Sequence, residues 1–224
     1  MPPALPDLLL ITDPAWGDEM VPRIDAALAV AGLGRVGVQL RAKGAPGEPR
    51  SDRARLALGR ELRAITSRWG APLLINGRVD LAAILGAEGV HLPESGIEVG
   101  EARRLLPGAR WIGRSCHDAE GLRAASAEGA DYATLGPFGP VPGKGSPLGP
   151  AGFEALASGC SLPLYALGGL GVAEIGAALE AGARGVAMIR GLACSADPAA
   201  ALRAILAEID RARASGTDAP PRRT

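Results

Sequence analysis

Residues 162–170 read LPLYALGGL. The first six form a short apolar run, the glycines Gly168 and Gly169 end it, and a helical pattern follows over Val172–Glu180. A short strand that is apolar on both faces and leads directly into a helix is typical of a parallel sheet covered by helices. This stretch therefore predicts one strand–helix unit of an α/β fold.

The same unit recurs along the rest of the chain. The predicted strands cover residues 8–13, 36–40, 72–76, 89–92, 110–114, 131–135, 162–167 and 185–189. The predicted helices cover residues 18–31, 52–69, 78–85, 98–106, 118–128, 150–157, 172–180 and 198–214. No Gly-x-Gly-x-x-Gly motif follows the first strand, which disfavours a dinucleotide-binding sheet.

Eight such units in about 200 residues predict a single (β/α)8 TIM barrel. We place this one compact domain at residues 1–213 and predict that the Pro/Arg/Thr-rich residues 214–224 form a disordered C-terminal tail. Barrels of this kind carry their chemistry on the loops that follow the strands. Candidate functional residues are therefore sought at the carboxyl end of each strand.

The composition excludes several classes of function. The chain has 224 residues, 47% of them hydrophobic, and its 24 basic residues balance its 24 acidic ones. This balance and the 3% of aromatic residues give no basic field or stacking platform for nucleic acid, and no stretch is long enough to span a membrane. The three cysteines lie far apart, which argues against a disulfide framework or a zinc site. We expect a cytoplasmic protein that binds a small molecule.

Two glycine-containing strand ends predict a phosphate site. Gly168-Gly169 follows the seventh strand and Arg190-Gly191 follows the eighth, and each opens a helix. Backbone N–H groups at such turns approach an anion closely, and the helix dipole favours negative charge there. Barrels frequently bind phosphate with these two loops. The alternative is that both are simply tight turns.

Further candidate ligand groups lie on other loops of the same edge. Arg41 and Lys43 are two residues apart after the second strand and could clamp an anionic group, and Asn76 ends the third strand, where its amide could bind a polar edge of the ligand. The Gly/Pro-rich loop at residues 136–149 is predicted as a lid in which Lys144 contacts phosphate. Solvated charges and a floppy insertion are the alternatives.

The two histidines also fall at predicted strand ends. His117 follows Ser115 after the fifth strand, where a histidine could both take and give a proton near neutral pH. We therefore predict His117 as the catalytic residue and Ser115 as a substrate contact. His91 is predicted to pack or to form hydrogen bonds at the barrel rim.

Eight short segments, in this order, resemble the thiamine phosphate synthase/TenI superfamily over roughly residues 8 to 205. They are Leu10–Asp13, Val38–Lys43, Ile75–Asp80, Gly89–Pro93, Ile112–His117, Ala130–Tyr132, Leu135–Pro137 and Leu167–Gly169. The resemblance implies a TIM barrel, a phosphorylated thiazole or pyrimidine substrate and a homodimer. The superfamily includes the synthase, which joins a pyrimidine diphosphate to a thiazole phosphate with Mg²⁺. It also includes TenI-type thiazole tautomerase, which aromatises a thiazole carboxylate phosphate by proton transfer.

The sequence departs from the synthase pattern where the resemblance implies metal ligands. Gly77 stands where the synthase has aspartate, and Pro93-Glu94-Ser95-Gly96 replaces its second acidic stretch. Of the synthase lid motif, only Lys144 remains. A diphosphate leaving group needs charge neutralisation, which Mg²⁺ normally supplies, whereas a proton shift needs an acid/base group and a phosphate anchor.

The departures therefore favour a tautomerase that uses no cofactor. In this interpretation His117 moves the proton and the arginine–lysine pair, Arg41 and Lys43, faces the substrate carboxylate. A first alternative is a thiamine phosphate synthase with altered Mg²⁺ binding through Glu94. A second alternative is a non-catalytic barrel that binds thiamine-precursor phosphates.

Overall fold

Eight parallel strands close into a barrel in chain order, so that β1 pairs with both β2 and β8. The computed structural model describes residues 4–42, 51–189, 191 and 195–216. The strands are β1 (Leu8–Ile11), β2 (Val36–Leu40), β3 (Leu73–Asn76), β4 (Gly89–Leu92), β5 (Trp111–Cys116), β6 (Tyr132–Leu135), β7 (Leu164–Leu167) and β8 (Gly185–Met188). This arrangement confirms the predicted TIM barrel.

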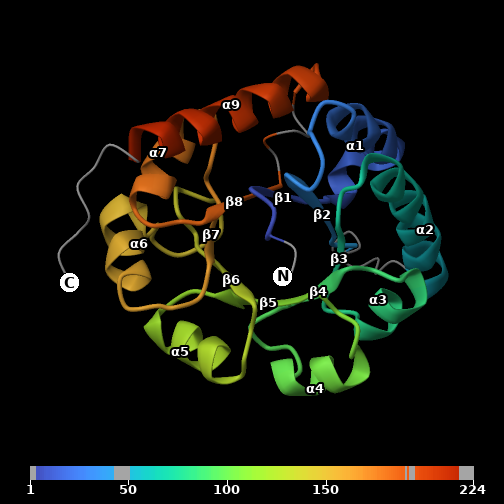
Figure 1. The fold of residues 1–224 in the computed structure, drawn as a ribbon, viewed down its shortest axis with the longest axis horizontal. Coiled ribbons are helices and arrows are strands. Elements are labelled where there is room, and N and C mark those ends of the chain that lie inside the picture. The colour runs from blue at the N-terminus through green and yellow to red at the C-terminus, as the bar shows by residue number, and fades with distance from the viewer. Residues whose placement is uncertain (1–3, 43–50, 190, 192–194, 217–224) are drawn as a thin grey trace.

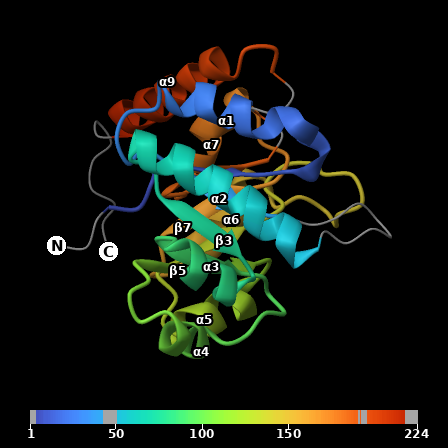
Figure 2. The same ribbon diagram turned by 90° about the vertical axis from the view of Figure 1, so that its right-hand side faces the viewer.

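Helices form a ring around the strands (Figure 1). They are α1 (Met20–Leu28), α2 (Asp52–Trp69), α3 (Val79–Leu85), α4 (Val99–Leu105), α5 (Ala119–Ala127), α6 (Gly149–Ala157), α7 (Val172–Glu180) and α9 (Pro198–Gly216), with a 3-10 helix at Pro14–Glu19 before α1. Figure 2 shows α9 beside α1 and α7, and α9 packs against both. No helix within the described ranges is long and apolar enough to cross a bilayer.

Local sequence signals fix where helices begin and end. The Ser51 hydroxyl accepts a hydrogen bond from the Ala54 N–H at 3.2 Å and caps α2, which stops at Gly70 in the left-handed conformation. The Asp118 carboxylate caps α5 in the same way, accepting from the Gly121 N–H at 2.8 Å. These caps direct each chain segment from a strand into its covering helix.

The barrel interior changes from apolar to polar along the strands. Trp111, Tyr132 and Tyr165 belong to the cluster that fills the inside of the barrel. Gln39 pairs in register with Leu74 of this cluster and therefore faces the same way. Gln39 and His91 are nevertheless buried, with 1% and 2% of their surface exposed. Polar groups therefore cap the apolar interior near the carboxyl ends of the strands.

Asp7 joins distant parts of the chain at the opposite end of the barrel. Its carboxylate lies 2.9 Å from Arg35, 3.3 Å from Arg184 and 2.7 Å from Arg213, and only 13% of the Asp7 side chain is exposed. Burial alone would raise the pKa of Asp7, but hydrogen bonds from Arg213 and Arg35 outweigh it, and the pKa is lowered. Asp7 thus stays ionised and ties the start of β1 to β2, β8 and α9.

Several predicted boundaries differ from the structure by one to three residues, among them the end of β5 and the end of α9. Strand β5 extends to Cys116, beyond the predicted end at Arg114, because its last two residues continue the ladder with β6. The predicted start of the disordered tail, at residue 214, is wrong because α9 continues to Gly216. The remaining predicted tail, residues 217–224, lies outside the described residues.

Candidate active site at the carboxyl ends of the strands

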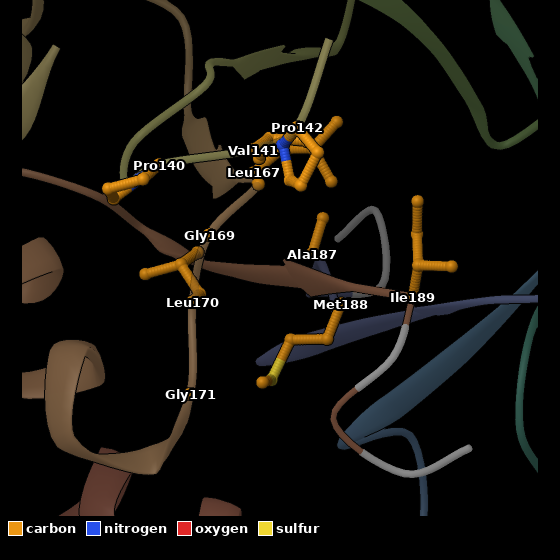
Figure 3. Close-up of a pocket in the computed structure, with 11 residues that line it drawn as sticks. Pro140, Val141, Pro142, Leu167, Gly169, Leu170, Gly171, Ala187, Met188 and Ile189 are labelled. Atoms are coloured by element: carbon orange, nitrogen blue, oxygen red, sulfur yellow. The ribbon is translucent and has the colours of Figure 1, made fainter. Parts of the chain in front are cut away.

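A cavity of about 330 Å³ lies between the loops that follow β6, β7 and β8 (Figure 3). It is lined by Pro140–Pro142, Leu167–Gly171 and Ala187–Ile189. Figure 3 shows Ala187 and Ile189 pointing toward the Pro140–Pro142 loop, whereas Met188 points to the other side of the strand. A ligand that enters this cavity therefore contacts apolar side chains and glycine backbone.

Gly168 and Gly169 shape one wall of this cavity. Their φ angles are 90° and 66°, and a Cβ on Gly169 would lie 2.3 Å from the carbonyl carbon of Gly139. Only glycine fits there without strain. Helix α7 begins just after them, and the first N–H groups of a helix have no partner inside that helix. The Gly171 N–H at this turn is already used, because it donates to Glu174 at 2.8 Å. This geometry supports phosphate binding, which stays a prediction.

A second cavity, of about 200 Å³, lies at the ends of β2 and β3. Its lining includes Asn76 and two cationic side chains, Arg55 and Arg78. Arg78 forms ion pairs with Asp80 at 2.5 Å and with Asp52 at 2.6 Å, and these hydrogen bonds raise the pKa of its guanidinium. The positive charge of this cavity is therefore largely balanced by carboxylates.

Gln39 and Asn76 form an amide pair inside the barrel mouth. Gln39 Nε2 donates to Asn76 Oδ1 at 3.0 Å. Gln39 Oε1 is buried and has no hydrogen-bond partner in the part of the chain that the structure describes. A buried carbonyl oxygen without a donor is costly. This oxygen therefore has acceptor capacity that the protein leaves unused, although Gln39 itself lines neither cavity.

His91 is held in a buried polar cluster. Its Nδ1 lies 3.1 Å from the Tyr132 hydroxyl, and its Nε2 lies 3.0 Å from the Ser115 hydroxyl and 3.4 Å from that of Thr134. Burial, and secondarily the charge of Arg114, lower the pKa of His91 to about 4. His91 is therefore a neutral hydrogen-bonding group at the rim.

His117, the predicted catalytic residue, follows β5 and is 44% exposed. Its Nδ1 donates to the Gly136 carbonyl oxygen at 2.5 Å, and its Nε2 lies 3.9 Å from the Glu94 carboxylate. It lines neither of the two cavities. The neighbouring Cys116 is buried, which raises the pKa of its thiol to about 12, so it packs as a neutral side chain.

The other predicted residues are spread over the same edge. Arg41 is half-buried, and its backbone N–H donates to the Thr12 hydroxyl at 2.8 Å. Lys144 is exposed and does not line the glycine-walled cavity. Gly191 is exposed, while Lys43 and Arg190 lie outside the described residues. Of the predicted residues, Asn76 lines one cavity and Gly168 and Gly169 line the other, whereas Lys144 lines neither.

A resident Mg²⁺ would need oxygen ligands from side chains at the barrel mouth. Among the described residues, no three histidine, cysteine, aspartate or glutamate side chains come together as a metal site. Gly77 has no ligand atom on a side chain, and the Glu94 carboxylate faces His117. The described residues therefore form no dedicated protein cage for Mg²⁺, an ion that proteins usually hold with one or two carboxylates together with substrate phosphates and water.

Some of these groups escaped the sequence prediction. The sequence pattern places Gln39 only near a strand end and gives the Tyr132 hydroxyl no role. A polar residue at an inward position of a strand is the signal that could have found both. Reading that signal requires the register between strands, which the sequence alone does not supply.

Comparison with known proteins gives consistent matches along the chain. Residues 8–192 match the family described as thiamine monophosphate synthase. The chain is 44% identical to a putative thiamine-phosphate synthase of Geobacter sulfurreducens over 205 residues, covering 89% of this chain and 92% of that protein. It is 38% identical to a thiamine-phosphate synthase of Methanoculleus marisnigri, covering 94% and 98%. A solved thiamine phosphate pyrophosphorylase from Pyrococcus furiosus superimposes with a TM-score of 0.80 at 26% identity, covering 92% and 96%.

Proposed function

The chain belongs to the thiamine monophosphate synthase/TenI family of thiamine biosynthesis, and we propose that it joins a pyrimidine diphosphate to a thiazole phosphate. The thiazole ring nitrogen bonds to the exocyclic methylene carbon of the pyrimidine. The bond from that carbon to the diphosphate oxygen breaks, and inorganic pyrophosphate leaves. Relatives named thiamine-phosphate synthases support this reaction over the tautomerase that Gly77 and His117 led us to expect.

The observation that carries the proposal is the free acceptor on Gln39. Thiamine's pyrimidine has an amino group next to a ring nitrogen, so it offers an N–H donor beside an acceptor. Gln39 Oε1 can accept from that amino group, and the Asn76 amide that holds Gln39 has an NH₂ to donate to the ring nitrogen. A thiazole carboxylate phosphate has no amino group to satisfy this oxygen.

The remaining features fit two phosphorylated reactants held side by side. The loop at Gly168 and Gly169 supports binding of the thiazole phosphate, with apolar contacts along Ala187–Ile189 for its ring. Holding both reactants in the barrel mouth replaces a bimolecular encounter with an oriented one. Such orientation can lower the activation free energy by about 7 kcal/mol. The amide pair then aligns the pyrimidine carbon with the thiazole nitrogen.

The test is a direct assay with purified protein, the two precursors and separate Mg²⁺ and EDTA arms, with thiamine phosphate and pyrophosphate measured. We expect both products. Gln39→Met, which keeps the volume but removes the acceptor, should lower kcat/KM for the pyrimidine diphosphate about tenfold. The matched control His117→Gln should change it less than about threefold. Absence of product in both arms would refute the proposal.

A second candidate, thiazole tautomerase, rests on the geometry of His117. A carbonyl oxygen can only accept, so Nδ1 carries the hydrogen in its bond to Gly136 and leaves Nε2 as a base beside Glu94. Accelerated aromatisation of the thiazole carboxylate phosphate that His117→Gln abolishes would favour this reaction. Binding of phosphate esters without turnover in either assay would identify a non-catalytic barrel.

A further inference from the structure

Three hydrogen-bonding side chains run from the centre of the barrel to its mouth. Tyr132 is fully buried, His91 is 2% exposed, and Ser115 is half-buried. The Tyr132 hydroxyl lies 3.1 Å from His91 Nδ1, and His91 Nε2 lies 3.0 Å from the Ser115 hydroxyl. We call these three residues the Tyr–His–Ser chain.

The hydrogens in this chain have one consistent arrangement. Burial raises the pKa of the Tyr132 phenol well above its ordinary value and lowers that of His91 to about 4, so both groups are neutral near pH 7. Within the described residues, His91 is the sole hydrogen-bond partner of the Tyr132 hydroxyl. If His91 Nδ1 carried the hydrogen, the phenol hydrogen would be buried without an acceptor, which costs free energy.

The phenol therefore donates to Nδ1, and His91 carries its hydrogen on Nε2. Nε2 lies 3.0 Å from the Ser115 hydroxyl and 3.4 Å from that of Thr134, so the hydrogen is donated mainly to Ser115. A serine hydroxyl has one hydrogen and two lone pairs. Since His91 uses a lone pair of Ser115, the Ser115 hydrogen is left to point to an acceptor elsewhere. In the part of the chain that the structure describes, no other group bonds to this hydroxyl.

We propose that Tyr132 and His91 are positioning residues that aim the Ser115 hydroxyl, as a hydrogen-bond donor, at a phosphoryl oxygen of the bound substrate. This inference rests on the proposed function, because that function places phosphorylated reactants in the barrel mouth. Ser115 is the residue that contacts the ligand, and the other two act through it. The chain thereby converts a freely rotating hydroxyl into a fixed donor.

Neighbouring residues hold the Tyr132 end of the Tyr–His–Ser chain in place. A Cβ on Gly113 would lie 2.1 Å from the Tyr132 ring, so the bare backbone of β5 makes room for the phenol. The ring stacks on His91 with centroids 5.5 Å apart and meets Tyr165 edge-on at 5.4 Å. Tyr165 in turn donates to the Pro6 carbonyl oxygen at 2.6 Å. The phenol therefore has little freedom to turn away from His91.

The experiment measures Kd by calorimetry for inorganic pyrophosphate and, separately, for the thiazole phosphate, and measures unfolding in urea for every variant. Ser115→Ala should weaken binding of one of the two ligands at least about tenfold, which identifies the source of the phosphoryl oxygen. His91→Gln keeps an N–H donor near the Nε2 position and should stay within about threefold of the wild type. His91→Asn is too short to reach Ser115 and should weaken binding about as much as Ser115→Ala does.

A double-mutant cycle separates positioning from packing. In the Ser115→Ala background, Tyr132→Phe and His91→Asn should have no further effect on Kd, although they still lower stability. Additive effects on Kd, or equal binding by His91→Gln and His91→Asn, would overturn the proposal, as would binding of neither ligand by the wild type. If the wild type binds pyrophosphate but forms no thiamine phosphate, the proposed function fails while the cycle still decides the role of the chain.

Discussion

Acidification should destabilise this barrel through one buried imidazole. His91 has a pKa of about 4 in the folded protein, mainly because of burial, against 6.5 in the unfolded chain. Between pH 4 and pH 6.5 the His91 imidazole is protonated in the unfolded chain but stays neutral in the folded protein. The contribution of His91 to the free energy of unfolding is therefore fully present above pH 6.5. It is lost as the pH is lowered from 6.5 toward 4.

The magnitude follows from the two pKa values. The whole difference corresponds to about 3 kcal/mol, at about 1.4 kcal/mol for each unit of pKa. Between pH 7 and pH 5 the linkage relation gives a loss of about 2 kcal/mol from His91 alone. This interval lies above the range in which most carboxylates titrate, so it isolates the imidazole.

The assay is urea unfolding at pH 7 and pH 5, followed by tryptophan fluorescence, for the wild type, His91→Gln and His117→Gln. The His91 variant should lose most of the pH dependence, because glutamine does not titrate. The His117 variant removes the exposed histidine and should retain it. A wild-type loss below about 0.5 kcal/mol, or the same loss in His91→Gln, would refute the reasoning.

Three further substitutions test other parts of the structure. Asp7→Asn should lower the free energy of unfolding by about 2 kcal/mol in urea titrations, because it leaves three arginines without their shared carboxylate. A change below about 0.5 kcal/mol would show that these ion pairs contribute little. Gly113→Ala should cost about 3 kcal/mol in the same measurement because its Cβ meets the buried phenol at 2.1 Å, whereas Gly100→Ala, with open space in a helix, should cost nothing or stabilise. Gly169→Ala should weaken thiazole phosphate binding at least about tenfold in calorimetry, while Gly143→Ala, which shares a positive φ but has open space, should change it less than about twofold; equal effects would contradict a phosphate site at the glycine wall.

The fold could be predicted from the sequence because its signals are local. Each strand is a short apolar run, and glycines such as Gly70 and Gly86 end helices in the left-handed conformation. Eight repetitions of that pattern left few alternatives. The boundary at Cys116 was missed because the end of β5 depends on pairing with β6, which is not a local property.

The candidate site was predicted less completely, because its chemistry depends on register. Asn76 and the glycine loop could be placed at strand ends from the sequence, and both line cavities in the structure. The pairing of Gln39 with Asn76 depends on how β2 aligns with β3, and the contact between His91 and Tyr132 depends on how β4, β5 and β6 align. His117 drew attention as a histidine at a strand end, but its position outside both cavities could be seen only in three dimensions.

The ion pairs at Asp7 can be completed only late in the synthesis of the chain. Arg213, which holds the Asp7 carboxylate from helix α9, lies 206 residues later in the sequence. At typical ribosomal speeds the first strand emerges roughly 10 to 40 seconds before this partner. For most of that time, until β8 has also emerged, β1 lacks its partner on one side and exposes an open edge. Nascent copies on one polysome could pair through such edges, so a chaperone that shields β1 until α9 leaves the ribosome would raise the yield of closed barrels.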